Sequence, residues 1–269
     1  MNPKSLQHRV RRGAPLACRA SFCLWLLGLL LILPIPAARA ATVQVAVAAN
    51  FSGTLQRLAP LFQQASGHTL QVSAGSTGKL VAQIRNGAPF DVFLAADAET
   101  PAQLEAEGLA VAASRVTYAV GRLVLWSPDP ARIDGRPDVL KAGNFRHLAM
   151  ANPRVAPYGQ AAQQTLEKLN LAQTLAPRLV LGESIAQAHQ FVASGNAELG
   201  FVALAQVMTD GQLGAGSFWL VPPSLHAPLR QDAVWLRRAR DAAAAQALLA
   251  FLRSAAARAV IAAAGYALP

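Results

Sequence analysis

Four short polar turns contain the residue types in this chain that could bind a small anion. They span 48–53, 73–79, 151–159 and 182–185, and each follows an apolar run and precedes a helical stretch. At the start of a helix the first N–H groups have no partner within the helix and carry a partial positive charge. The turns therefore predict an anion site built from neutral N–H and O–H donors. For any single turn an ordinary capped helix is the alternative, with Asn50 or Ser52 as the cap in the first turn.

The glycine-rich turn at 73–79 could also be a nucleotide-binding loop. A Walker A motif requires Gly, four residues and then Gly-Lys-Ser/Thr. Counting back from Gly78 and Lys79 puts Ser73 at the first position, and Leu80 follows the lysine. Both ends of the motif fail, and Leu80 has no hydroxyl to hold magnesium. We therefore expect no nucleotide hydrolysis at this turn.

Enzymatic, metal and nucleic-acid interpretations find little support elsewhere. No Gly-x-Ser-x-Gly elbow follows residue 40, and the basic cluster at 237–240 has no aromatic partners, so we expect neither a hydrolase nor nucleic-acid binding. Asp91 and Asp97 flank an apolar run, where a strand-start residue and a helix cap explain them. The histidines after the leader lack zinc-helix spacing and are expected in surface or satisfied positions. They are His68, His147, His189 and His226.

The net charge of +10 belongs mostly to the first 40 residues. Six of the 24 basic residues and none of the acidic ones lie there, which leaves +4 for the rest. A basic stretch to Arg19, an apolar run over 22–33 and Ala38-Arg39-Ala40 form the pattern of a secretory signal, with cleavage expected after Ala40 and delivery to the periplasm. A retained anchor is the alternative, and Sec and twin-arginine export stay open. Both cysteines, Cys18 and Cys23, lie in this leader, so we expect no disulfide or thiol nucleophile in the exported chain.

The remaining sequence alternates strand-like and helical segments. This periodicity predicts an α/β protein with βαβ units and parallel sheet. The expected strands cover 42–48, 70–72, 91–95, 118–126, 147–151, 178–181, 199–203, 218–221 and 232–235. The expected helices cover 51–64, 79–84, 101–107, 160–169 and 184–192, with two more in 241–264 ended by Gly265.

Two successive α/β series joined by long extended segments predict two lobes, with the chain crossing between them more than once. We place the first lobe at 41–121 plus 226–269 and the second at 122–225. A single α/β domain is the alternative.

The longer segments resemble a known family. These are AANFSGTLQRLAPLF, SAGSTGKLVAQIRNGAPFDVFLAAD, RLVLWSPDP, ANPRVAPYGQAA, ASGNAELGFVAL and AAGYALP. In this order and spacing they resemble the periplasmic molybdate-binding proteins of ABC-type molybdate importers. The resemblance implies a type II periplasmic binding fold whose two α/β lobes close on a bare tetrahedral oxyanion. It also implies a non-enzymatic, monomeric receptor for molybdate and tungstate that delivers its ligand to a membrane permease.

The same resemblance assigns the anion-binding residues. Asn50 and the hydroxyl pair Ser76 and Thr77 would bind from the first lobe, and Tyr158 and the main-chain N–H of Ile185 from the second. All five lie in the four turns. The metal would be held only as its oxyanion, with no direct protein ligand and no further cofactor.

Two positions depart from the family pattern. Relatives often have Ser or Thr where this chain has Ala49, so the side-chain and main-chain amides of Asn50 would have to compensate. Ala203 stands where many relatives have a tyrosine, and Tyr158 would take that role. Ser76 and Thr77 are not ranked by the sequence. A receptor for sulfate or phosphate, or a periplasmic hydrolase using the Ser76/Thr77 turn, remain the alternatives.

Overall fold

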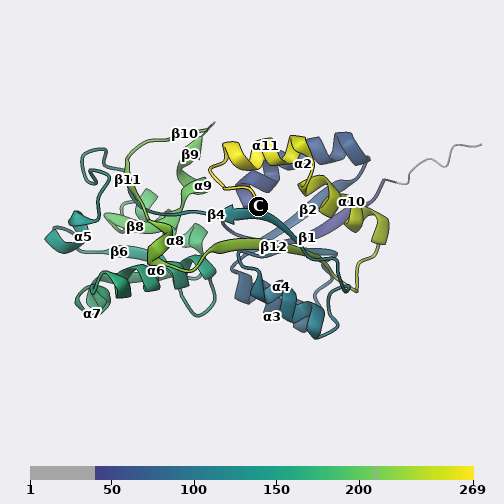
Figure 1. The fold of residues 1–269 in the computed structure, drawn as a ribbon, viewed down its shortest axis with the longest axis horizontal. Helices are drawn as coiled ribbons and strands as arrows, with labels where there is room; N and C mark the ends of the chain where they lie inside the picture. The colour runs from purple at the N-terminus through teal and green to yellow at the C-terminus, as the bar shows by residue number, and fades with distance from the viewer. Residues whose placement is uncertain (1–39, 210) are drawn as a thin grey trace, which may run out of the picture. The chain divides into compact units, whose positions relative to one another are not determined.

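A computed structural model describes residues 40–209 and 211–269, which form one compact unit. The leader predicted over 1–40 lies outside the described residues except for Ala40. The architecture of the described residues is carried by a pair of five-stranded sheets (Figure 1). The predicted α/β class with two lobes is confirmed.

The first sheet has the strand order β2-β1-β3-β12-β4. Strands β1, β2 and β3 are parallel, whereas β12 runs antiparallel to both β3 and β4. The elements of this half are β1 (Thr42–Ala48), α2 (Ser52–Ser66), β2 (Thr69–Gly75), α3 (Thr77–Arg85), β3 (Val92–Leu94), α4 (Glu99–Ala106), β4 (Val116–Gly121), β12 (Leu229–Trp235), α10 (Ala242–Leu252) and α11 (Ala255–Ala263).

The second sheet repeats this plan with the order β11-β5-β8-β6-β7. Strands β6, β7 and β8 are parallel, and β5 is antiparallel to β8 and β11. Its elements are β5 (Leu123–Ser127), α5 (Asp138–Ala142), β6 (Leu148–Ala151), α6 (Pro157–Lys168), α7 (Ala172–Leu175), η1 (Ala176–Arg178), β7 (Leu179–Gly182), α8 (Ile185–Ala193), β8 (Leu199–Ala203), α9 (Leu204–Val207), β11 (Ser217–Leu220) and η2 (Pro223–Leu225), beside a small hairpin of β9 (Met208–Thr209) and β10 (Gln212–Leu213).

The chain passes directly between the sheets at two places. Strand β4 ends at Gly121 in the first sheet, and β5 begins at Leu123 in the second. Strand β12 returns from the second half into the first sheet (Figure 1). Both crossing segments therefore enter or leave a sheet through strands that lie antiparallel to a neighbour.

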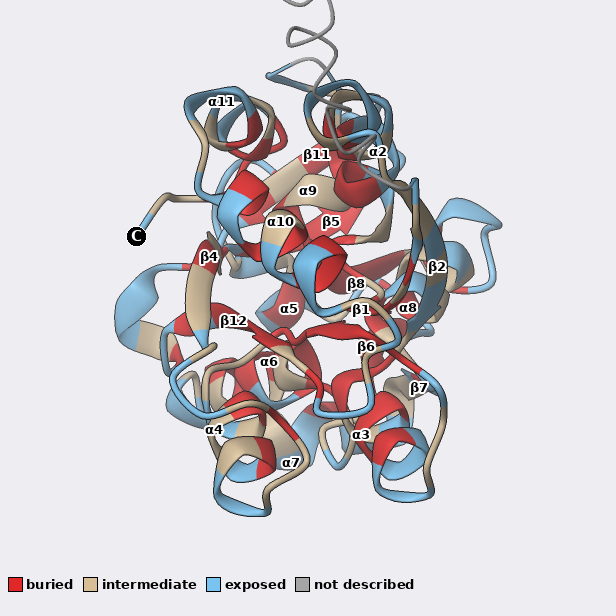
Figure 2. Ribbon diagram, turned by 90° about the vertical axis from the view of Figure 1, so that its right-hand side faces the viewer, coloured by how far each residue is buried: buried red, intermediate tan, exposed pale blue. Residues whose placement is uncertain are grey.

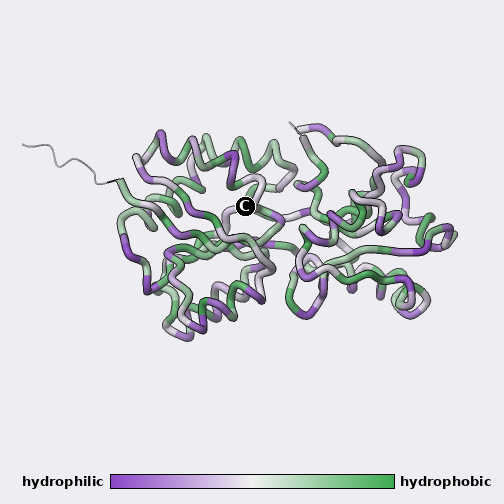
Figure 3. The backbone as a smooth tube through the Cα atoms, turned by 180° about the vertical axis from the view of Figure 1, so that it is seen from behind, coloured by the Kyte–Doolittle hydropathy of each residue, from purple (hydrophilic) through white to green (hydrophobic). Residues whose placement is uncertain are grey.

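Apolar side chains cover both faces of the first sheet because helices pack on both. Alternate residues of β1 point to opposite sides, so Val43, Val45 and Val47 pack with α2, α10 and α11, while Ala46 packs with α3. A strand that is buried on both faces has a nearly continuous apolar sequence, as residues 42–48 do. The buried residues follow the central strands and the inner faces of the helices, whereas the edge strand β2 is exposed or half-buried (Figure 2). Along the helices, hydrophobic and hydrophilic residues alternate (Figure 3).

Several predicted elements need correction. The expected strand over 118–126 is two strands in different sheets, because the chain crosses at Arg122. The helix expected to begin at Pro101 begins at Glu99, and the helix expected from residue 160 begins at Pro157, whose fixed φ suits the first helical position. Each sheet is mixed rather than parallel throughout. The two helices expected within 241–264 are confirmed, and Gly265 follows the second with φ +94°.

No single helix in the described ranges has both the length and the hydropathy required to cross a membrane, and only α10 with α11 meets that test as a bent pair.

Candidate functional site

The four polar turns converge on one small cleft. They connect β1 to α2, β2 to α3, β6 to α6 and β7 to α8, at the carboxyl ends of parallel strands where α/β folds place their ligands. All five residues predicted for the site line this cleft: Asn50, Ser76, Thr77, Tyr158 and Ile185. The structure thus brings the predicted residues together from both halves.

The two hydroxyls of the β2–α3 turn differ in their bonding. Ser76 is the N-cap of α3 and Thr77 is its first residue, and both are buried. The Thr77 hydroxyl accepts a hydrogen bond from the main-chain N–H of Ala96 at 3.1 Å. The Ser76 hydroxyl has no hydrogen-bond partner among the described residues and does not cap its own helix. A buried hydroxyl without a partner is costly, so Ser76 is the group in this turn most in need of a ligand.

Asn50 is held by its neighbours through its side chain. Its Nδ2 donates to Gln231 Oε1 at 2.9 Å and to the Tyr266 hydroxyl at 3.1 Å, which uses both amide hydrogens. In this orientation the amide has no hydrogen left for the cleft, and its Oδ1 is buried without a hydrogen-bond partner among the described residues. That Asn50 replaces the donor missing at Ala49 stays a prediction. Its main-chain N–H is the donor left to face the cleft. Neither Asn50 nor Ser52 caps α2, since Phe51 holds the N-cap position without a side-chain bond.

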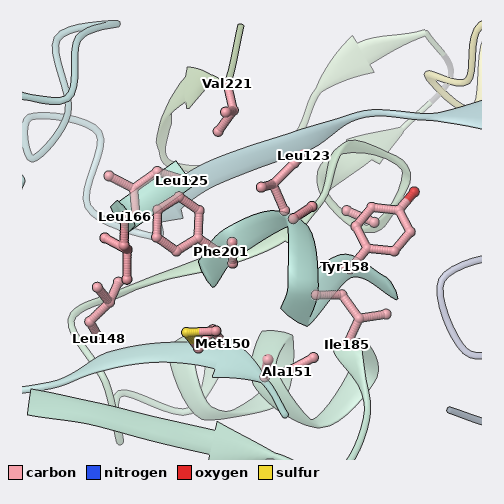
Figure 4. Packing of buried hydrophobic residues seen from close by; sticks show 14 of the residues in the cluster. Leu123, Leu125, Leu148, Met150, Ala151, Tyr158, Leu166, Ile185, Phe201 and Val221 are labelled. Atoms are coloured by element: carbon pink, nitrogen blue, oxygen red, sulfur yellow. The ribbon is translucent and has the colours of Figure 1, made fainter. Parts of the chain in front are cut away.

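Tyr158 enters the site from the first turn of α6. Its ring belongs to the apolar core of the second half together with Leu123 and Ile185, and Figure 4 shows its hydroxyl pointing away from that cluster. The hydroxyl oxygen accepts a hydrogen bond from Gln231 Nε2 at 3.1 Å. Burial raises the pKa of Tyr158 well above its ordinary value of 10. The group therefore stays protonated at neutral pH and can act as a donor.

Ile185 contributes the N-terminus of α8. Ser184 is the N-cap, and its hydroxyl accepts from the main-chain N–H of Gln187 at 3.3 Å. The Ile185 carbonyl accepts from Gln206 Nε2 at 3.2 Å, which ties this turn to α9. The N–H of Ile185 itself is the first of the helix, so it adds the positive end of the helix dipole to the cleft wall.

The lining of the cleft carries no ionisable charge. Apart from the five predicted residues it consists, within the described chain, of small or apolar residues: Ala48, Ala49, Gly75, Ala96, Ala156 and Pro157. An anion here would meet aligned N–H and O–H dipoles in a poorly hydrated space, where such donors act strongly.

The two halves touch directly beside the cleft. The main-chain N–H of Gly78 donates to the carbonyl of Val155 at 3.0 Å. The ammonium of Lys79 forms an ion pair with the carboxylate of Glu183. Both contacts join the start of α3 to turns of the second half, so the structure is that of a closed cleft.

Three buried polar residues behind the cleft were not predicted from the sequence, namely Tyr118, Gln231 and Tyr266. Gln231 is completely buried on β12 and contacts both Asn50 and Tyr158. Gln231 precedes the predicted strand 232–235, and no local signal in the sequence marks its amide as buried.

Three residues for which the sequence predicts no role in binding contact other parts of the fold. Asp91 accepts main-chain hydrogen bonds from Gln44 at 2.7 Å and Arg240 at 2.8 Å. Asp97 accepts from the N–H of Thr100 at 2.8 Å near the start of α4, and burial raises its pKa. His189 lies within α8 and stacks on Trp126, and the loss of solvent lowers its pKa. None of these three residues lines the cleft.

Comparison with known proteins identifies close relatives of the chain. Residues 43–267 match the family model described as bacterial extracellular solute-binding protein. The chain is 56% identical over 232 residues to the molybdate-binding protein ModA of Azotobacter vinelandii, covering 86% of this chain and 92% of the relative. It is 48% identical over 240 residues to ModA of Rhodobacter capsulatus, covering 89% and 93%.

A solved structure has the same fold. The periplasmic molybdate-binding protein of Azotobacter vinelandii superposes with a TM-score of 0.83 at 43% sequence identity, covering 84% of this chain and 99% of that one.

Proposed function

The chain belongs to the ModA family of bacterial extracellular solute-binding proteins, which are binding proteins and not enzymes. From this premise we propose that it captures molybdate in the cleft between its two halves. Tungstate, an oxyanion of the same shape and charge, is the second ligand of the proposal. The cargo is passed to the membrane permease of an ABC-type importer.

The observation that carries this proposal is the set of neutral donors in the cleft, above all the buried and unpartnered hydroxyl of Ser76. A dianion there would accept hydrogen bonds from Ser76, Thr77 and Tyr158 and from the main-chain N–H groups of Asn50 and Ile185. A protonated competitor would leave one of these donors facing another donor, and each mismatch costs affinity. Neutral dipoles thus favour the dianion without a lysine or arginine.

Size separates molybdate from its nearest competitor, sulfate. Molybdenum–oxygen bonds are longer than sulfur–oxygen bonds, so a cleft whose donors fit the larger tetrahedron leaves sulfate with stretched hydrogen bonds. A sulfate or phosphate receptor is the alternative of the same class. The hydrolase alternative is not supported, since no histidine or cysteine is among the residues lining the cleft.

The lobes of the proposal are residues 41–121 plus 226–269 and residues 122–225. Binding closes them about the two crossing segments, and contacts such as Gly78 to Val155 hold the closed form that docks on the permease. The leader over 1–40 directs the chain to the periplasm and is removed after Ala40.

Thermal unfolding with candidate anions tests the assignment. The protein is purified from the periplasm and melted with molybdate, tungstate, sulfate or phosphate at equal concentration. A ligand at 100 times its dissociation constant stabilises the folded state by about 2.7 kcal/mol through mass action. We expect large upward shifts of Tm with molybdate and tungstate. A shift with sulfate or phosphate and none with molybdate would refute the molybdate assignment.

A further inference from the structure

A chain of buried hydrogen bonds runs behind the cleft from the main chain of Asn50 to the hydroxyl of Tyr158. It passes through Tyr266, the Asn50 side chain and Gln231, all at most 4% exposed. Tyr266 follows α11, Asn50 follows β1, and Gln231 lies on β12. Tyr158 belongs to the opposite half. This series of hydrogen bonds therefore joins residues that are far apart in sequence and lie on both sides of the cleft.

The directions of the hydrogen bonds in this series are read starting from one fixed acceptor. The Tyr266 hydroxyl lies 2.8 Å from the main-chain carbonyl of Asn50, which can only accept, so Tyr266 donates its single proton there. Its oxygen is then left to accept from the Asn50 side chain at 3.1 Å, which requires the amide nitrogen on that side. Amide orientation is assigned from such networks. The carbonyl favours the orientation in which Nδ2 faces Tyr266 and Oδ1 is buried without a partner among the described residues.

The same logic continues through Gln231. The second hydrogen of Asn50 Nδ2 points at Gln231 at 2.9 Å, so the Gln231 atom facing it is the oxygen. That oxygen also lies 3.0 Å from the hydroxyl of Tyr118, which shares its single proton between this oxygen and the carbonyl of Ala95 at 2.8 Å. The other end of the amide is consequently the nitrogen, which donates to the Tyr158 hydroxyl at 3.1 Å. Tyr158 must accept this bond, and its own proton is turned away from Gln231.

We propose that Gln231 is a positioning residue for the bound anion, aligning the Tyr158 hydroxyl so that its proton points into the cleft. The inference rests on the proposed function, since it assumes an anion that accepts this proton. Gly121 supports it, because a Cβ there would lie 2.2 Å from the Tyr158 hydroxyl and 2.7 Å from Gln231 Nε2. The crossing segment leaves room for these two groups to meet. Through Gln231, the orientation of a donor in the second lobe thus depends on a strand of the first lobe.

A double-mutant cycle between Gln231→Met and Tyr158→Phe, read by titration calorimetry with molybdate, tests the proposal. Gln231→Met keeps similar volume and removes the amide, and we expect it to weaken binding roughly tenfold, within the range for a hydrogen bond to a charged group. In the Tyr158→Phe background it should cost almost nothing more, because the hydroxyl that it orients is gone. Equal losses in both backgrounds would overturn the proposal, since a purely structural role does not depend on that hydroxyl.

Two further variants keep the test decisive. Tyr118→Phe is the matched control: it removes another buried hydroxyl bonded to Gln231 but leaves the directional chain intact, so affinity should stay within about twofold. If Gln231→Met does not fold, Tyr266→Phe replaces it in the same cycle, because it removes the donor to the fixed carbonyl. If wild type binds sulfate or phosphate and not molybdate, the proposed function fails, and the cycle is run with the anion that binds. Additivity there still overturns the role of Gln231.

Discussion

Two helix N-termini show how the same residue in the same position can serve binding or stability. Ser76 precedes α3 with φ −71° and ψ 148°, and Ser254 precedes α11 with φ −66° and ψ 156°. The Ser254 hydroxyl accepts the N–H of Ala257 at 3.2 Å and caps its helix. The Ser76 hydroxyl caps nothing and is left in the cleft. The two serines therefore have the same backbone conformation. They differ because the Ser76 hydroxyl makes no hydrogen bond to its own helix.

The first turn of α3 is satisfied in another way. Its Gly78 N–H donates across the cleft to Val155 instead of to a side chain of its own turn. The N-terminus of α3 is thus completed only when the two halves are together. That of α11 is completed within its own turn. A helix start that lacks its own cap can couple its bonding to closure, whereas a self-capped start cannot.

The largest expected effect is that of Ser76→Ala on anion binding. A hydrogen bond to a charged group contributes about 1.5–3 kcal/mol, so the dissociation constant for molybdate should rise roughly 10- to 150-fold. The free protein should keep its Tm, because the hydroxyl has no partner among the described residues to lose. Calorimetry and thermal unfolding of the anion-free protein measure the two quantities.

Thr77→Val is the neighbouring control. It removes the acceptor of the Ala96 N–H and leaves that buried donor unpaired, which costs about 1–3 kcal/mol of unfolding free energy. If Ser76→Ala destabilised the free protein as much as Thr77→Val, the distinction between the two hydroxyls would be lost.

An intermediate effect is expected from Gly78→Ala. A Cβ at this position would lie 3.1 Å from both the Cα and the carbonyl oxygen of Val155, closer than side-chain carbons normally approach. Closure would require the second half to move by a few tenths of an ångström, so we expect a loss of affinity smaller than that of Ser76→Ala. Gly53→Ala in the first turn of α2 is the matched control, because nothing lies within 4 Å of its Cβ. Equal affinities for the two alanine variants would mean that the Gly78 contact does not limit closure.

The sequence could predict the turns but not how their side chains are used. Apolar runs such as 42–48 and glycine-flanked polar residues predict a strand, a turn and a helix from local rules. The order of elements agrees at all four turns, although the helix of the third turn begins at Pro157 and not at residue 160. Ser76 and Ser254 look alike to such rules, because the fate of each hydroxyl depends on residues brought near by folding. Local rules likewise read 118–126 as one strand, although Gly121 and Arg122 interrupt its apolar pattern where β4 ends and β5 begins.

Gln231 also shows that local sequence rules do not predict how a polar side chain is used. It lies just before the predicted strand 232–235, and from the sequence its amide could face solvent as easily as the interior. It becomes a buried junction because folding brings three other segments next to it, which contribute Asn50, Tyr118 and Tyr158. Local pattern therefore indicates where a ligand can bind, while the orientation of donors depends on tertiary contacts.

The smallest expected effect on binding is that of Ser254→Ala. Loss of an N-cap serine costs about 1 kcal/mol, so chemical denaturation should show an unfolding free energy lower by that amount. Affinity for molybdate should not change, since the hydroxyl serves Ala257 and does not line the cleft. Ser254→Asp restores a capping acceptor and should recover the stability. A loss of affinity in Ser254→Ala that Ser254→Asp recovers would show that α11 reaches the site through Tyr266. The two helix starts would then not be independent, because α11 precedes the tyrosine that fixes the Asn50 amide.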